Sequence, residues 1–186
     1  MIYLLVAIRA EFPEKLIPKK YKDKIKIIYM GIGVLNAYST LSMLSLTSKD
    51  IIINLGSAGT NNKILLNQVV GCKIFFMEEY SVFSPYKLKL NSYSSNLPLR
   101  RIHFKFSHIN FKFCYTYLKF SSKIKYEVID MEAFGLAKYC NQNKLPFLSL
   151  KYISDSGKIK DWERQLDEGA KRLKKELVKL LKINNI

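Results

Sequence analysis

The hydrophobic pattern of the chain alternates between short apolar runs and segments with helical spacing. Continuous apolar runs are typical of strands buried on both faces, and such runs occur at Ile2–Ile8, Ile25–Met30, Ile51–Leu55, Val69–Met77 and Phe147–Ile153. Apolar residues recur at helical spacing in Val34–Leu46 and in Ala133–Cys140, which predicts two amphipathic helices. This alternation predicts an α/β layered fold with a largely parallel sheet.

Two further segments complete the predicted order of elements. A C-terminal helix is predicted after Asp161, its expected N-cap, from the apolar stripe Leu166, Ala170, Leu173, Leu177 and Leu181. Aromatic residues on alternate positions favour antiparallel strands in an edge hairpin or a short insert; they are Phe104, Phe106, Phe111, Phe113, Tyr115 and Tyr117. Because no repeat or linker interrupts the pattern, we expect a single domain over residues 1–186.

Three acidic residues each stand just past the end of a predicted strand. They are Glu11, Asp155 and Glu132, the last of which follows a strand predicted to end at Glu127–Asp130. The glycine-rich turn Gly56-Ser57-Ala58-Gly59 follows another strand in the same way. Parallel strands share one rim at their carboxyl ends, where open α/β sheets bind ligands. Three carboxylates at one rim suit cleavage of a glycosidic bond, which needs an acid, a base and a group that holds the sugar. Glu11 and Asp155 could instead cap helices, and Glu132 could pair with a lysine; spacing alone leaves both interpretations open.

Composition narrows the class of protein. The chain has 186 residues, 48% of them hydrophobic, and no apolar run approaches the ~20 residues of a membrane span. Its apolar N-terminus leads directly into Glu11, so we interpret it as a core strand rather than a signal peptide. Three widely spaced cysteines and two histidines suggest neither a disulfide framework nor a metal site, and they fit a reducing cytoplasm.

The formal net charge of +16 is large for this length. Such a charge is compatible with a polyanionic partner, through neutralisation of phosphates. The lysines are spread along the chain, however, and a composition rich in Lys, Asn, Ile and Tyr produces the same charge without any partner. We therefore do not expect nucleic-acid binding to be the main function.

Several stretches resemble motifs of the nucleoside phosphorylase and nucleosidase superfamily, most closely those of the 5′-methylthioadenosine/S-adenosylhomocysteine nucleosidases. The stretches are AIRAE at Ala7–Glu11, MGIGVLNAYST at Met30–Thr40, INLGSAGT at Ile53–Thr60, VIDMEAFGLAKYC at Val128–Cys140 and FLSLKYISD at Phe147–Asp155. They follow the family's order along the chain. The resemblance implies a three-layer αβα fold with a mixed, largely parallel central sheet, as in nucleoside phosphorylases.

The resemblance also implies catalytic roles for two carboxylates. Glu11 matches the residue that positions and activates the attacking water, and Asp155 matches the acid that protonates the adenine ring at N7. Ser154 would orient Asp155. No cofactor and no metal ion is needed for a reaction of this kind.

Other positions match residues that bind the nucleoside. Glu132, with Met131 beside it, matches the group that holds the ribose hydroxyls. Ser57, with Gly56 and Ala58, would line the sugar and water side. The chain looks shortened relative to the family between Tyr80 and Tyr126, the region that normally carries the adenine-stacking aromatic residue, and Phe120 is our choice for that role.

One position bears on the choice between hydrolysis and phosphorolysis. Phosphorylases of the superfamily carry an arginine two residues before the Gly-Ser pair, and Asn54 stands there in this chain. An asparagine cannot supply the cationic fork that phosphate favours. Arg9, near Glu11 in the sequence, keeps phosphorolysis open.

The resemblance therefore implies a purine nucleosidase that acts on 5′-methylthioadenosine, S-adenosylhomocysteine or a related 5′-modified adenosine, and that works as a homodimer. The alternatives are a phosphate-dependent purine nucleoside phosphorylase, a hydrolase for another nucleoside such as futalosine, and a non-catalytic relative that binds a nucleoside or a polyanion. Dependence of turnover on phosphate would separate the first alternative from hydrolysis.

Overall fold

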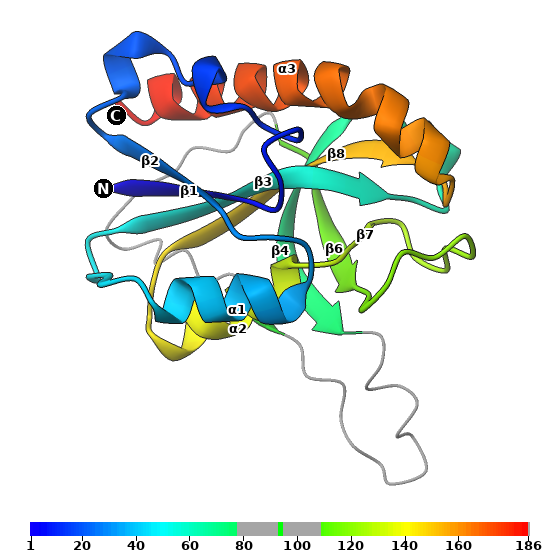
Figure 1. The fold of residues 1–186 in the computed structure, drawn as a ribbon, viewed down its shortest axis with the longest axis horizontal. Helices are drawn as coiled ribbons and strands as arrows, with labels where there is room; N and C mark the ends of the chain where they lie inside the picture. The colour runs from blue at the N-terminus through cyan, green and yellow to red at the C-terminus, as the bar shows by residue number, and fades with distance from the viewer. Residues whose placement is uncertain (78–92, 95–108, 186) are drawn as a thin grey trace, which may run out of the picture.

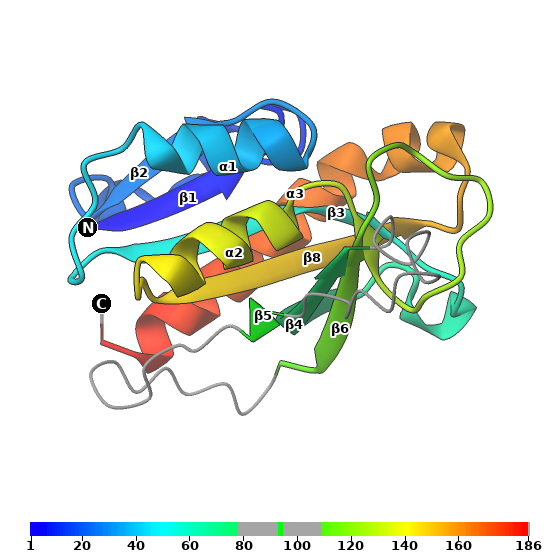
Figure 2. The same cartoon turned by 90° about the horizontal axis from the view of Figure 1, so that it is seen from below.

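The computed structural model describes residues 1–77, 93–94 and 109–185. Its mixed sheet begins with parallel neighbours in the order β2 (Ile25–Tyr29), β1 (Ile2–Val6), β3 (Ile51–Gly59) and β8 (Phe147–Asp155). It continues through β4 (Val69–Met77), which is antiparallel to β8, and then β6 (Phe111–Thr116), which is parallel to β4. The short strands β5 (Tyr93–Ser94) and β7 (Ile129–Asp130) pair with β4 and β6. The arrangement is visible in Figures 1 and 2.

Helices cover both faces of this sheet. α1 (Val34–Ser42) and α2 (Ala133–Gln142) lie side by side on one face, and the long α3 (Ile159–Ile183) crosses the other (Figure 1). Each face has its own apolar core, because successive side chains of a strand point to opposite sides: Leu5 packs in the core beneath α1 and α2, and Leu4 packs in the core beneath α3. The structure thus confirms the three-layer αβα fold with a mixed sheet.

The C-terminal helix forms because its apolar stripe covers the sheet. Leu173, Leu177 and Leu181 are buried against the strands, while the lysines of α3 face solvent. The predicted N-cap was wrong: α3 begins at Ile159 with Lys158 as its N-cap, so Asp161 lies within the first turn, where a negative charge suits the helix dipole. Among the residues that the structure describes, no helix is both long enough and apolar enough to cross a membrane.

Two expectations about strands also needed correction. The Gly56–Gly59 segment is not a turn, because β3 runs on to Gly59 and pairs with β8 along this stretch. The aromatic alternation marks a strand at Phe111–Thr116, but this strand is parallel to β4 rather than antiparallel. Phe104 and Phe106 lie outside the described residues.

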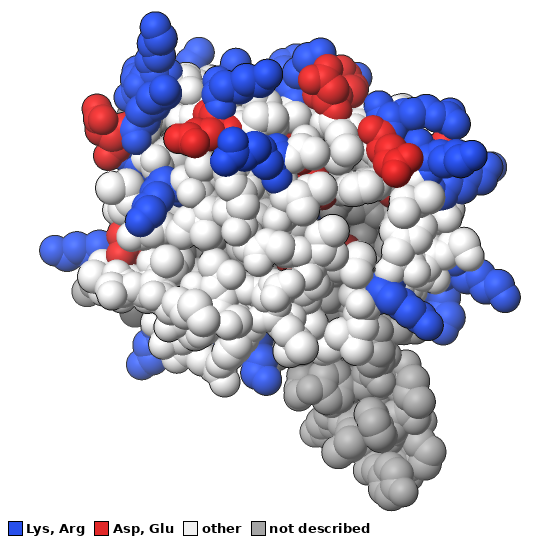
Figure 3. Space-filling model, in the orientation of Figure 1, with Lys and Arg blue, Asp and Glu red and all other residues white. Residues whose placement is uncertain are grey.

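Charged side chains are dispersed over the surface. In the face shown in Figure 3, lysine and arginine side chains lie around the margin and leave the centre largely uncharged. Several lysines and arginines of α3 pair with acidic residues one helical turn away, as Lys171 does with Asp167 and Arg172 with Glu168. The excess positive charge therefore forms no continuous stripe on this face.

Candidate active site

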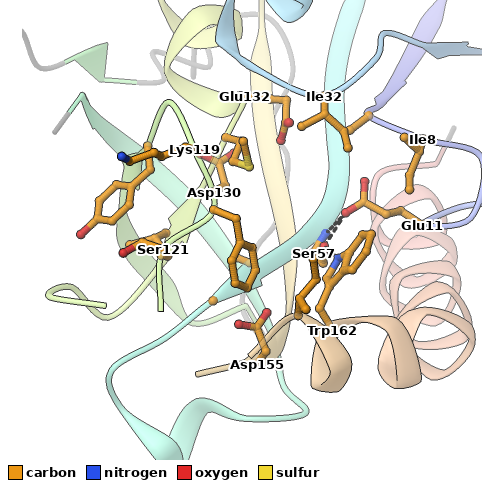
Figure 4. Close-up of a pocket in the computed structure, with 18 residues that line it drawn as sticks. Ile8, Glu11, Ile32, Ser57, Lys119, Ser121, Asp130, Glu132, Asp155 and Trp162 are labelled. Atoms are coloured by element: carbon orange, nitrogen blue, oxygen red, sulfur yellow. Dashed lines mark hydrogen bonds between the residues drawn. The ribbon is translucent and has the colours of Figure 1, made fainter. Parts of the chain in front are cut away.

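A cavity of about 250 Å³ opens at the carboxyl ends of β1, β3 and β8. Glu11, Glu132 and Asp155 all line it, although they come from distant parts of the chain (Figure 4). All three are buried, with at most 8% of their surface exposed. The expected convergence is therefore present in the structure, but only Glu11 and Asp155 follow strands parallel to β3; Glu132 follows β7 (Ile129–Asp130), which is antiparallel to β3.

Glu11 is held by the end of β3. Its Oε1 accepts a hydrogen bond from the backbone N–H of Ser57 at 2.9 Å and another from the Ser57 hydroxyl. The indole Nε1–H of Trp162, in the first turn of α3, donates to the Ser57 Oγ at 2.8 Å. Residues of β3 and α3 thus fix one carboxylate at the cavity wall (Figure 4).

Glu132 links the start of α2 to the turn between β2 and α1. Its Oε1 accepts a hydrogen bond of 2.8 Å from the backbone N–H of Gly33. Gly33 has a φ of +105°, a backbone conformation that residues other than glycine rarely adopt. The pKa of Glu132 is raised to about 7, mainly by burial; the Lys151 ammonium and the Gly33 N–H oppose the rise, and the charges of Asp130 and Glu11 add to it.

Asp155 ends β8 and is held by its immediate neighbours. Its Oδ2 accepts from the Ser154 hydroxyl at 2.8 Å, and its Oδ1 accepts from the backbone N–H of Gly157 at 2.7 Å. Gly157 has a φ of +93°, and a Cβ at this position would lie 2.6 Å from the carbonyl oxygen of Ser122. Only glycine fits there, so the turn that presents Asp155 depends on it.

A buried ion pair lies beside these carboxylates. Lys151 Nζ is 2.8 Å from Asp130 Oδ2, and both side chains are at most 1% exposed. Asp130 also accepts hydrogen bonds from Thr116 Oγ1 at 2.6 Å and from the Ala133 N–H at 2.8 Å. Burial lowers the pKa of Lys151, but the Asp130 and Glu132 carboxylates outweigh burial and raise it, so the ammonium stays charged.

These contacts bear on the two interpretations that spacing left open. The N-cap residue of α3 is Lys158 and that of the short 3₁₀ helix after Glu11 is Pro13, so neither Glu11 nor Asp155 occupies a cap. Glu132 bonds the Gly33 N–H, and the buried lysine pairs with Asp130 instead. Glu132 does occupy the N-cap position of α2, but its side chain makes no capping hydrogen bond there, and all three carboxylates line the cavity.

The remaining expected site residues lie at or just behind the cavity wall. Ala58, Met131 and Phe120 line it, with Phe120 43% exposed at the rim. Gly56 lies behind Glu11, since a Cβ there would be 3.4 Å from Glu11 Oε2. Ser154 contacts Asp155 and does not line the main cavity.

Sequence reasoning missed several residues of the site, among them Asp130, Lys151 and Trp162. Lys151 is the one charged side chain inside the otherwise uncharged interior of β8, before its terminal Asp155, and that contrast was a usable signal. Asp130 was visible only as part of a motif. Trp162 gave no local signal, because its contact with Ser57 joins positions 105 residues apart.

The positions that bear on phosphate binding lie away from the cavity. Asn54 is 1% exposed; its amide donates to the Leu5 carbonyl at 3.1 Å and accepts from Ser149 Oγ at 2.9 Å. Arg9 is exposed, with its guanidinium 5.2 Å from the centre of the Tyr29 ring, outside the cavity lining. Lys119 is the one cationic residue among the described lining residues. Among those described residues, no group of three or more His, Cys, Asp or Glu side chains is placed to hold a metal ion.

Comparison with known proteins shows which solved structures share this fold. No protein-family model matches the chain, and the sequence search of curated proteins found no match. Solved structures do match over nearly the whole chain. The 5′-methylthioadenosine/S-adenosylhomocysteine nucleosidase of Helicobacter pylori, solved with butyl-thio-DADMe-Immucillin-A, is 20% identical with a TM-score of 0.77, over 97% of each chain.

Two other solved structures are equally informative. The nucleosidase of Colwellia psychrerythraea, solved with adenine, is 16% identical with a TM-score of 0.79, over 98% of this chain and 95% of that one. Futalosine hydrolase of H. pylori is 19% identical with a TM-score of 0.77, over 97% of each chain. At these identities the similarity establishes the fold, and the chain therefore has the fold of the 5′-methylthioadenosine/S-adenosylhomocysteine nucleosidases.

Proposed function

We propose that this protein is a purine nucleosidase that hydrolyses the N-glycosidic bond of 5′-methylthioadenosine, S-adenosylhomocysteine or a related 5′-modified adenosine. The observation that carries the proposal is the convergence of Glu11, Glu132 and Asp155 on one cavity. The fold it shares with nucleosidases, one solved with adenine and one with butyl-thio-DADMe-Immucillin-A, supports the same reaction class. The substrate class also rests on the motif resemblance.

The reaction divides among the three carboxylates. Glu11 takes a proton from water as the water oxygen bonds to C1′ of the sugar. The C1′–N9 bond breaks, and Asp155 passes a proton to N7 of the purine, so that neutral adenine leaves. Glu132, with Met131 beside it, holds the ribose hydroxyls, and the surrounding negative charge stabilises the positive charge that develops on the sugar ring.

Water, rather than phosphate, is the proposed nucleophile. Both polar atoms of the Asn54 amide are engaged by Leu5 and Ser149, and Arg9 lies outside the cavity. The buried Lys151 is committed to Asp130. Lys119, an exposed lysine at the rim, offers a single point charge rather than the fork of donors that phosphate favours.

We also propose that the protein acts in the cytoplasm as a homodimer of one domain per chain, residues 1–186, without cofactor or metal. The dimer rests on the family resemblance. The cytoplasm fits the three cysteines, which are all free and buried in the structure. The dispersed lysines of Figure 3 support the view that nucleic acid is not the main partner.

The test is base release measured by chromatography from 5′-methylthioadenosine, S-adenosylhomocysteine and futalosine, in phosphate-free buffer and with added phosphate. Base and free sugar without phosphate are expected from one of the adenosine substrates. Release only with phosphate, giving a sugar phosphate, would make the protein a phosphorylase. Nucleoside binding without release in either buffer would make it a non-catalytic relative.

Substitution of the two proposed catalytic carboxylates sharpens this test. Glu11→Gln and Asp155→Asn should each lower kcat by about 10²- to 10⁴-fold, the range for general acid–base groups, while circular dichroism stays unchanged. Glu14→Gln is the matched control, because Glu14 is an exposed glutamate three residues after Glu11. Full activity in both Glu11→Gln and Asp155→Asn would show that the roles are wrongly assigned.

A further inference from the structure

Trp162 and Ser57 form a hydrogen-bonded chain that ends on a cavity carboxylate. The indole Nε1–H donates to Ser57 Oγ at 2.8 Å, and the Ser57 hydroxyl donates to Glu11 Oε1. An indole N–H can only donate, so the Ser57 oxygen must be its acceptor. Since a serine hydroxyl has a single proton, this leaves that proton for Glu11.

The two carboxylate oxygens of Glu11 differ in their hydrogen bonds. Oε1 accepts from both the backbone N–H and the hydroxyl of Ser57. In the part of the chain that the structure describes, Oε2 accepts no hydrogen bond. One oxygen is therefore fixed by the protein and the other is available to a ligand in the cavity.

We propose that Trp162 is a positioning residue that, through the Ser57 hydroxyl, fixes Glu11 Oε1 and so leaves Oε2 as the atom that takes the proton of the attacking water. This inference rests on the proposed function, because it concerns the same hydrolysis. Trp162 itself also lines the cavity, so its packing must be separated from its hydrogen bond.

Two variants separate the packing of Trp162 from its N–H. Trp162→Phe keeps an aromatic ring at the wall and removes the donor, and we expect kcat to fall about tenfold with KM within about twofold. In a Ser57→Ala background the same change should alter kcat by less than about twofold, because the relay is already broken. Glu163→Gln, at an exposed position next to Trp162, is the control and should behave as wild type.

A second measurement does not depend on activity. Trp162 is the only tryptophan in the chain, so its indole N–H gives a single cross-peak in a proton–nitrogen NMR spectrum. Hydrogen–deuterium exchange of this N–H should be about tenfold faster in Ser57→Ala than in wild type, and slow again in Ser57→Thr, which restores a hydroxyl.

The outcomes distinguish this inference from the proposed function. An unchanged exchange rate of the indole N–H in Ser57→Ala would show that Trp162 does not donate to Ser57, and it would refute the inference. Base release by wild type, together with wild-type kcat in Trp162→Phe or an equal loss in both backgrounds, would refute the positioning role alone. No base release by wild type from any nucleoside would refute the proposed function and, with it, the positioning role.

Discussion

Replacing Lys151 with methionine tests how strongly burial changes the contribution of an ion pair to the free energy of unfolding. Lys151→Met keeps a long apolar side chain on β8 and removes the ammonium that lies 2.8 Å from Asp130. Breaking a buried pair by removing one partner costs about 3–5 kcal/mol, because a buried charge is left uncompensated. Asp130 would still accept hydrogen bonds from Thr116 and Ala133, so we expect the lower end, about 3 kcal/mol.

The chain supplies a matched control on its surface. Lys112 lies 3.0 Å from Glu127, nearly the same separation, but these side chains are 22% and 47% exposed. Exposed pairs contribute about 0–1 kcal/mol, so Lys112→Met should change the free energy of unfolding by no more than that. The two variants thus differ in burial far more than in geometry.

Urea unfolding at pH 7, followed by circular dichroism, measures both variants. A loss of about 3 kcal/mol corresponds to a fall of about 1 M or more in the urea midpoint. Adding Asp130→Asn to Lys151→Met should recover part of the loss, because the stranded carboxylate is removed. If Lys151→Met lowered the free energy of unfolding by no more than Lys112→Met, burial would not strengthen the contribution of the Lys151–Asp130 pair.

Three further predictions concern other parts of the site. The pKa of Glu132 in the folded protein is raised to about 7, so its free energy contribution to folding is lost as the pH rises. The free energy of unfolding of the wild type should therefore fall by up to about 3 kcal/mol between pH 4.5 and 7 relative to Glu132→Gln; equal pH dependence of the two proteins in urea unfolding would contradict this. Gly157→Ala should lower the free energy of unfolding by about 1–3 kcal/mol and lower kcat, because the added Cβ strains the left-handed turn whose N–H donates to Asp155; a melting temperature and a rate equal to those of wild type would exclude such strain. Phe120→Ala should raise KM about tenfold or more at nearly unchanged stability if its ring stacks on the base, and an unchanged KM would remove it from that role.

The sequence by itself determined which segments become strands and helices. The apolar run Val69–Met77 is strand β4 to the residue, and the runs beginning at Ile2, Ile25, Ile51 and Phe147 all start strands. Local pattern suffices here because a segment must bury its apolar side chains, and the spacing of those side chains differs between helix and strand. The convergence of Glu11 and Asp155 followed from the same information, since β1 and β8 run parallel to β3 and share its carboxyl rim, whereas Glu132 follows β7, which runs antiparallel to β3.

Only the tertiary structure decided what each segment meets. The continuation of β3 through Gly59 depends on pairing with β8, and the direction of Phe111–Thr116 depends on β4. In the same way, the raised pKa of Glu132 and the bond from Trp162 to Ser57 arise from neighbours far away in the chain. The physical reason is that burial and periodicity are properties of one segment, whereas strand direction, electrostatic environment and hydrogen-bond partners belong to pairs of segments that only folding brings together.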